Sequence, residues 1–174
     1  MTKKRLNMPS LSLEAEQLWL LLLAVWILVI FGHSMTPADL SSQESGRVLT
    51  LLCGMLDKIG VGSGWLTEHL VRKTAHFCEY AVFGMLLMKN FYLYSQRSRG
   101  YRQTASRFLP LALAVLAVPF LDETIQLFSP GRSAQISDVW LDMAGACFGL
   151  LAAALVKRLW NMSRPRGRRR RGWR

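Results

Sequence analysis

Residues 18–31 read LWLLLLAVWILVIF, the uninterrupted apolar core of a run that extends to Met35. A helix needs roughly 20 mostly apolar residues to cross the hydrocarbon core of a bilayer. Three further runs approach this length and composition, at residues 75–94, 108–128 and 139–160. Because the chain has only 174 residues and 51% of them are hydrophobic, these runs leave little room for a soluble domain. The sequence therefore predicts an all-α, polytopic membrane protein with four transmembrane helices.

The residues before the first run argue against a cleaved signal peptide. Lys3, Lys4 and Arg5 resemble the basic start of such a peptide, but Glu14 and Glu16 directly precede the apolar core and no small-residue cleavage site follows. We expect an uncleaved membrane anchor. The predicted organisation is a cytoplasmic N-terminal tail at residues 1–17, a membrane domain at 18–160 and a polybasic cytoplasmic tail at 161–174.

The net charge of +11 comes from basic residues placed beside the apolar runs. In a soluble domain this excess would suggest nucleic-acid binding. Here the positive-inside rule explains it better, because Lys and Arg avoid the translocated side of a membrane. The last eleven residues, RPRGRRRRGWR, are expected to contact anionic lipid headgroups. We expect membrane lipids, and no nucleic acid, as partners of this tail.

The distribution of Lys and Arg also predicts the orientation of the chain. Most of these residues fall in the N-terminal tail, in the loop between the second and third runs, and in the C-terminal tail. The other two loops hold only Arg47, Lys58, Arg72, Lys73 and Arg132. We therefore predict a multi-pass protein of a bacterial cytoplasmic membrane with both termini in the cytoplasm.

Polar side chains gather where the second, third and fourth runs meet the predicted extracytoplasmic side. RKTAHFCEY (72–80) opens the second run, DETIQ (122–126) closes the third, and GRSAQISD (131–138) leads into the fourth. Ionisable groups within or beside spans are costly and by default mark a working site. Candidate catalytic residues are His76, Glu79 and Asp122. Candidate ligand-binding residues are Arg72, Lys73, Tyr80, Glu123, Gln126, Arg132, Asp138 and Asp142.

Helical spacing indicates which side chains share a face. Asp122 and Gln126 form an i, i+4 pair, whereas Glu123, next to Asp122, points elsewhere. Gly145 and Gly149 form a GxxxG pattern, which permits close approach to a neighbouring helix. Residues 47–59 carry apolar side chains at helical spacing and predict an amphipathic helix that lies on the outer surface or caps the bundle, ended by a glycine-rich turn at 60–64.

Three interpretations of the polar cluster remain open. The charges could form a purely structural network that joins the helices, although apolar packing would do so without desolvating them. Arg72 and Arg132 could instead bind the phosphate or carboxylate of a lipid, a lipid-linked envelope precursor or a lipopeptide. Thirdly, Glu79 could orient His76 as a general base or acid, with Ser133 as a weak candidate nucleophile.

The chain shows no clear metal or disulfide pattern. His76, Glu79, Asp122 and Asp138 could together supply one nitrogen and three oxygen ligands, but a single His with carboxylates is poor evidence for zinc. We assign no metal and no cofactor. His33 is expected at the outer end of the first run, and His69 in an exposed loop. Three cysteines are too scattered for a disulfide framework and receive no role: Cys53, Cys78 and Cys147.

Two segments resemble the VanZ-like family of small bacterial membrane proteins. They are RKTAHFCEYAVFG (72–84) and DETIQLFSPGRSAQISDVWLDMAGACFG (122–149), and the resemblance extends over roughly residues 34–160. At position 142 this chain has Asp where the family more often shows Asn. The resemblance implies a role in the bacterial envelope and, from the family's namesake, low-level resistance to the glycopeptide teicoplanin. It does not imply a particular reaction.

Overall fold

The computed structural model describes residues 11–97, 108–133 and 135–163. Throughout these residues the fold is all-helical, as predicted, without a strand. The five helices and their bounds are α1 (Leu11–Ser34), α2 (Ala38–Lys58), α3 (Glu68–Arg97), α4 (Leu109–Gln126) and α5 (Ile136–Ser163). The helices α3 and α5 contain the second and fourth apolar runs and extend beyond them. The helix α1 begins before the first run and ends one residue short of it, and α4 is slightly shorter than the third run at both ends. The predicted polybasic tail lies outside the described residues from position 164 onward, as do the basic residues at 3–5 and at 99–107.

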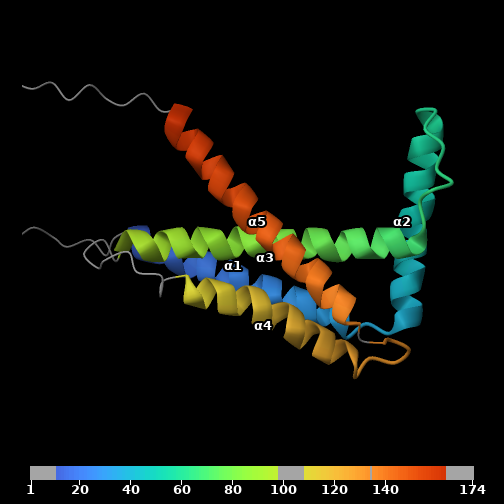
Figure 1. Cartoon of the computed structure of the whole chain (residues 1–174), viewed down its shortest axis with the longest axis horizontal. Helices are drawn as coiled ribbons and strands as arrows, with labels where there is room; N and C mark the ends of the chain where they lie inside the picture. The colour runs from blue at the N-terminus through green and yellow to red at the C-terminus, as the bar shows by residue number, and fades with distance from the viewer. Residues whose placement is uncertain (1–10, 98–107, 134, 164–174) are drawn as a thin grey trace, which may run out of the picture.

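The four long helices alternate in direction along the chain (Figure 1). The ends of α1 and α4 and the beginnings of α3 and α5 therefore lie at one end of the bundle. There α2 runs crosswise to the other helices. Among the helix pairs, α3 and α5 make the most extensive contact, and α3 also packs against α1 and α2. This topology brings the segments 72–80, 122–126 and 131–138 to the same end of the fold.

Glycines allow α3 and α5 to cross at very short range. A Cβ atom at Gly149 of α5 would overlap the carbonyl oxygen of Ala81, and one at Gly84 of α3 would overlap the carbonyl oxygen of Ala146. Gly145 also lies close to the α3 backbone, because its Cβ would meet the carbonyl oxygen of Phe77 at 2.5 Å. The predicted packing role of the Gly145–Gly149 pair is thereby confirmed, with Gly84 as an additional small residue on the partner helix.

A small apolar core is shared by α1, α3, α4 and α5. Its buried members are Ile30, Tyr80, Phe83, Val115, Val118 and Ala146. The outer surface of the bundle is also apolar, with large side chains such as Leu28, Phe120 and Leu151 each more than 60% exposed. Soluble monomers rarely expose extended apolar patches, whereas lipid requires them. The exposure pattern therefore fits a bundle surrounded by lipid.

Three helices in the described part of the chain are long and apolar enough to cross a membrane: α1 from Glu16 onward, α4 and α5. The prediction of four such segments was therefore too high by one. The exception is α3, which is 30 residues long and has sufficient length. Its first turns carry six ionisable side chains, which lower its average hydropathy: Glu68, His69, Arg72, Lys73, His76 and Glu79.

The predicted amphipathic helix is present but begins earlier, since α2 starts at Ala38 rather than at residue 47. Most of its apolar stripe is exposed, including Leu51, Met55 and Ile59. The chain then turns at Gly60, which has a positive φ of 78° that glycine adopts without strain. An exposed apolar stripe on a helix lying across the end of the bundle fits a position at the membrane interface.

Candidate functional site

Asp122 lies at the centre of a buried hydrogen-bond cluster between α1 and α4. Its side chain is fully buried, and its Oδ1 atom accepts a hydrogen bond of 2.5 Å from the Ser34 hydroxyl. The Gln126 amide donates to Asp122 Oδ2 at 3.3 Å and to Ser34 Oγ at 3.4 Å. The predicted contact between Asp122 and Gln126 is thus present. Ser34, the last residue of α1, was missed by the sequence analysis.

A tight turn after α4 places Arg132. The Arg132 amide donates to the Ser129 carbonyl at 3.2 Å, with Pro130 and Gly131 between them and a φ of +74° at Gly131. Proline at the second position and a positive-φ glycine at the third are typical of a type II turn. The turn is anchored by the Ser129 hydroxyl, which donates to the Ser34 carbonyl at 2.7 Å, and by the Pro130 carbonyl, which accepts from the Ala38 amide.

Three ion pairs surround this region. Lys73 of α3 bonds Asp138 of α5, with 3.0 Å between Nζ and Oδ1. Within α3, Arg72 bonds Glu68 at 2.7 Å. The third pair joins His33 of α1 to Glu79 of α3, with 2.9 Å between Nδ1 and Oε1.

The pair between His33 and Glu79 corrects one prediction. In the catalytic interpretation Glu79 would orient His76, but in the described structure its carboxylate bonds His33 and makes no hydrogen bond with His76. Although His76 and Glu79 lie one turn apart on α3, the end of α1 supplies a closer partner. His69 also differs from expectation, because it lies in the first turn of α3 rather than in a loop.

The neighbouring carboxylates Asp122 and Glu123 face different parts of the fold, as their adjacent positions on a helix predicted. Glu123 accepts a short hydrogen bond from the backbone amide of Gln135, just before α5. Tyr80 is fully buried with its hydroxyl beside Asp122. Tyr80 therefore belongs to the interior of the bundle rather than to an open surface.

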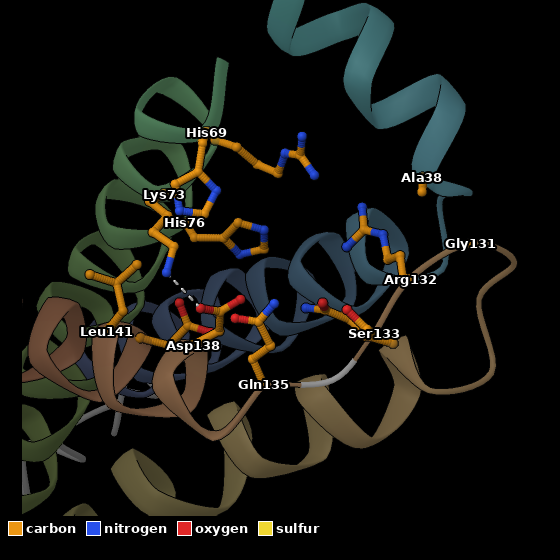
Figure 2. Close-up of a pocket in the computed structure, with 13 residues that line it drawn as sticks. Ala38, His69, Lys73, His76, Gly131, Arg132, Ser133, Gln135, Asp138 and Leu141 are labelled. Carbon is orange, nitrogen blue, oxygen red and sulfur yellow. Dashed lines mark hydrogen bonds and ion pairs between the residues drawn. The ribbon is translucent and has the colours of Figure 1, made fainter. Parts of the chain in front are cut away.

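A cavity of about 140 Å³ opens at this end of the bundle, between the start of α2, the first turns of α3 and the loop from α4 to α5 (Figure 2). The polar side chains that line it are His69, Arg72, Lys73, His76, Gln126, Arg132, Ser133, Gln135, Asp138 and Asp142. Most of the sequence-predicted ligand-binding residues thus contribute to one cavity. Tyr80 and Glu123 do not line it.

The positive charges of the cavity are unequally compensated. Lys73 bonds Asp138 and Arg72 bonds Glu68. The Arg132 guanidinium donates to the His33 carbonyl at 3.3 Å, and no described carboxylate lies within ion-pair distance of it. Burial and the neighbouring positive charge of Arg72 lower the pKa of Arg132. Arginine nevertheless stays protonated in proteins, so the cavity retains a cation without an acidic partner.

A second hollow of about 220 Å³ adjoins the first between α1, α2 and α3. The two share Arg72, His76 and Arg132, which therefore separate them. Val48, Val71 and Ala75 contribute apolar surface to the second hollow. A polar cavity and a partly apolar one thus meet at two guanidinium groups.

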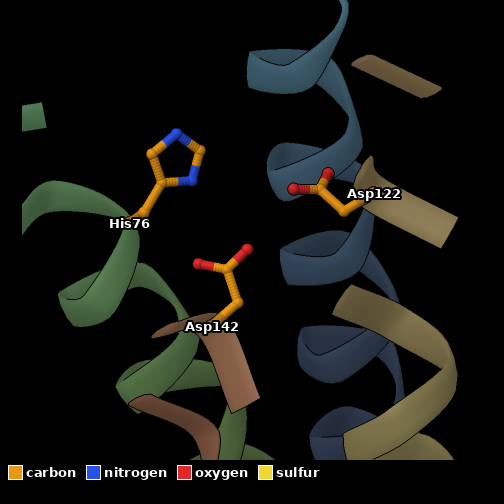
Figure 3. Close-up of side chains that lie close together, drawn as sticks. All are labelled: His76, Asp122 and Asp142. Atoms are coloured by element: carbon orange, nitrogen blue, oxygen red, sulfur yellow. The ribbon is translucent and has the colours of Figure 1, made fainter. Parts of the chain in front are cut away.

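The structure does not bring together the four residues that the sequence suggested as metal ligands. Of the four residues His76, Glu79, Asp122 and Asp138, Glu79 bonds His33 and Asp138 bonds Lys73. Asp142 lies near the other two residues instead of Glu79 and Asp138, because donor atoms of His76, Asp122 and Asp142 all lie within 4.8 Å of one another (Figure 3). These three side chains come from α3, α4 and α5.

The residues missed by sequence reasoning are His33, Ser34 and Ser129. Each is a polar residue that belongs to no recognisable sequence motif and acts mainly as a hydrogen-bond partner. One signal was available, because HSMTP at the end of the first run lies at the membrane depth of the other polar motifs. The Ser-Pro-Gly sequence before Arg132 likewise indicated a turn.

The fold and the site define a small helical membrane protein with a polar cluster at one end of its bundle. The chain matches the family described as VanZ/LLP1 over residues 18–157, and it belongs to this family. This confirms the resemblance inferred from the motifs, and it supports the general assignment as a VanZ-like envelope protein. Searches of curated proteins and of solved structures each found no match.

Proposed function

We propose that this protein binds the anionic headgroup of an envelope amphiphile at the polar end of its bundle. The ligand class is a lipid, a lipid-linked precursor or a lipopeptide that carries a phosphate or carboxylate. The observation that carries the proposal is Arg132, which is held by a rigid turn at a cavity and lacks an acidic partner in the described structure. A planar guanidinium is well suited to bidentate contact with such a headgroup.

The surroundings of Arg132 support the same interpretation. Arg72 lines the same cavity, and its Nε atom is buried without a hydrogen-bond partner among the described residues. Two guanidinium groups that face one cavity repel each other, and an anion between them would relieve that repulsion. The adjoining hollow, with its apolar side chains, offers a path for the hydrophobic part of an amphiphile.

The proposal includes a membrane topology with four crossings. In it α3 is the fourth crossing, since it runs antiparallel to α1 and α4, packs against α1 and α5, and has His76 and Glu79 partly buried among these neighbours. A span whose ionisable groups face the bundle interior can be less apolar than one exposed to lipid. Both termini lie in the cytoplasm, so the cavity and α2 lie at the extracytoplasmic leaflet, and the polybasic tail contacts anionic lipid on the other side.

The two alternative interpretations receive less support. Ion pairs of the kind required for a structural network join α3 to α5 and α1 to α3, but Arg132 lies outside them. Catalysis by a His76–Glu79 pair lacks its expected contact. Binding accounts for Arg132, whereas neither alternative requires it.

A susceptibility measurement in bacteria tests the proposal in the setting that the family implies. The full chain is expressed in a teicoplanin-susceptible bacterium, and the inhibitory concentration of teicoplanin is measured. We expect the chain to raise it and Arg132→Gln to abolish the increase while the protein still accumulates in the membrane. The control is Lys58→Gln, which removes a basic side chain from the exposed end of α2 and should have no effect. Full resistance with Arg132→Gln would contradict the proposal, and loss of the accumulated protein would show that Arg132 serves folding rather than binding.

A further inference from the structure

His76, Asp122 and Asp142 form a cluster of metal-binding donors at the inner end of the cavity. They project toward one another from three different helices (Figure 3). One nitrogen or oxygen atom from each lies within 4.8 Å of the other two. From this geometry we infer a binding site for one divalent transition-metal cation, of which Zn²⁺ is the probe. The inference stands on these three residues and does not rest on the proposed headgroup binding.

The charge balance of the cluster favours a cation. Asp122 and Asp142 are 0% and 1% exposed, respectively, and neither is in an ion pair with a described Lys or Arg. Burying carboxylates without compensation is strongly unfavourable. A divalent ion between them would offset both negative charges at once.

Asp142 gives a second, independent indication of a ligand. Its Oδ1 atom is buried and has no hydrogen-bond partner among the described residues. Buried polar atoms in folded proteins nearly always have a partner, so an orphaned carboxylate oxygen requires an explanation. Figure 3 shows the Asp142 carboxylate directed toward the space that His76 and Asp122 also face.

The neighbouring groups resemble the supports of a metal site. Ser34 and Gln126 donate to the two oxygens of Asp122 and fix its orientation. Hydrogen bonds of this kind hold metal ligands in position in known sites. His76 and Asp142 also line the cavity, so the outer side of the cluster is accessible for a fourth ligand such as water. Three protein ligands with one open position are typical of reactive zinc sites.

The donor set also limits the identity of the ion. An imidazole nitrogen suits zinc and other first-row transition metals, whereas Mg²⁺ and Ca²⁺ prefer sites made of oxygen. Zinc bonds of about 2.0–2.2 Å require donor atoms roughly 3.3 Å apart. The three donor atoms, which lie within 4.8 Å of one another, would have to approach each other by up to about 1.5 Å to reach that spacing.

The test uses the full-length chain, purified without a histidine tag, treated with a chelator and then dialysed. Bound metal is quantified by mass spectrometry, and Zn²⁺, Mn²⁺ and Mg²⁺ are titrated calorimetrically. We expect one Zn²⁺ per chain, with Zn²⁺ bound more tightly than Mg²⁺ and affinity at least tenfold weaker in His76→Gln and Asp142→Asn. The matched control is Asp57→Asn, which removes an exposed Asp outside the cluster and should bind as the unmodified chain does.

Thermal unfolding of the same proteins distinguishes a loss of metal binding from misfolding of the variant. Without metal, Asp142→Asn should be at least as heat-stable as the unmodified chain, because it removes an uncompensated buried charge. Added Zn²⁺ should raise the unfolding temperature of the unmodified chain but not that of Asp142→Asn. Absence of stoichiometric Zn²⁺, or an equal response of the two proteins to Zn²⁺, would overturn the inference.

Discussion

The contact between α3 and α5 should be unusually sensitive to the addition of a single methyl group. In Gly149→Ala the new Cβ overlaps the carbonyl oxygen of Ala81 and lies 2.8 Å from its carbonyl carbon. These are backbone atoms and cannot rotate away, so the two helices must separate. Overpacking of this kind costs about 1–3 kcal/mol. Replacing a helical glycine with alanine returns about 0.5–1 kcal/mol, so the net destabilisation is about 1 kcal/mol at the middle of these ranges and about 2.5 kcal/mol at most.

The control is a glycine-to-alanine substitution at a position where the new methyl group has space. Gly54 lies inside α2 and has no atom within 4 Å of its Cβ position, so Gly54→Ala should stabilise the protein by about 0.5–1 kcal/mol. Thermal unfolding in detergent, followed by far-ultraviolet circular dichroism, measures both variants. We expect Gly149→Ala to lower the midpoint by roughly 2–8 °C and Gly54→Ala to raise it slightly. An unchanged or higher midpoint for Gly149→Ala would show that the helices do not cross at this short distance.

Two further experiments test the hydrogen bonding and the topology. Ser34→Ala removes a buried hydrogen-bond donor to Asp122 and should lower the free energy of unfolding by about 1–3 kcal/mol. The control is Thr50→Ala on the exposed α2, which should change the free energy of unfolding by less than about 0.5 kcal/mol. Similar losses of stability in the two variants would refute the buried cluster. In a cysteine-free background, a membrane-impermeant maleimide should label Ser133→Cys in intact cells and Met162→Cys only after permeabilisation, and the reverse pattern would overturn the topology.

The sequence was sufficient for the parts of the fold that depend on periodicity and composition. Long apolar runs predicted the four long helices, and the amphipathic spacing at 47–59 predicted α2. Gly145 and Gly149 predicted a close helix contact because glycine permits an approach that other residues prevent. The prediction from apolar composition failed at α3, where polar side chains inside the bundle lower the hydropathy of a helix that packs against four others.

The pairing of side chains within the site was harder to predict. Spacing along one helix correctly joined Asp122 to Gln126, and it wrongly joined His76 to Glu79. The second pair failed because the choice of partner depends on the neighbouring helix, and His33 of α1 lies closer to Glu79. Similarly, Asp142 meets His76 only through the tight crossing of α3 and α5. Contacts between helices depend on the tertiary structure, and a single sequence gives little information about them.

The most direct test of headgroup binding is a titration of a short-chain phosphatidic acid into the full-length protein in detergent. Loss of a charge-assisted hydrogen bond costs about 1.5–3 kcal/mol, so Arg132→Gln should raise the Kd about tenfold or more, and Lys58→Gln should leave it unchanged. The same titration with a short-chain phosphatidylcholine should show much weaker binding to the unmodified chain. Equal affinity of the Arg132→Gln and unmodified proteins for phosphatidic acid would contradict an anionic headgroup site at the polar end of the bundle.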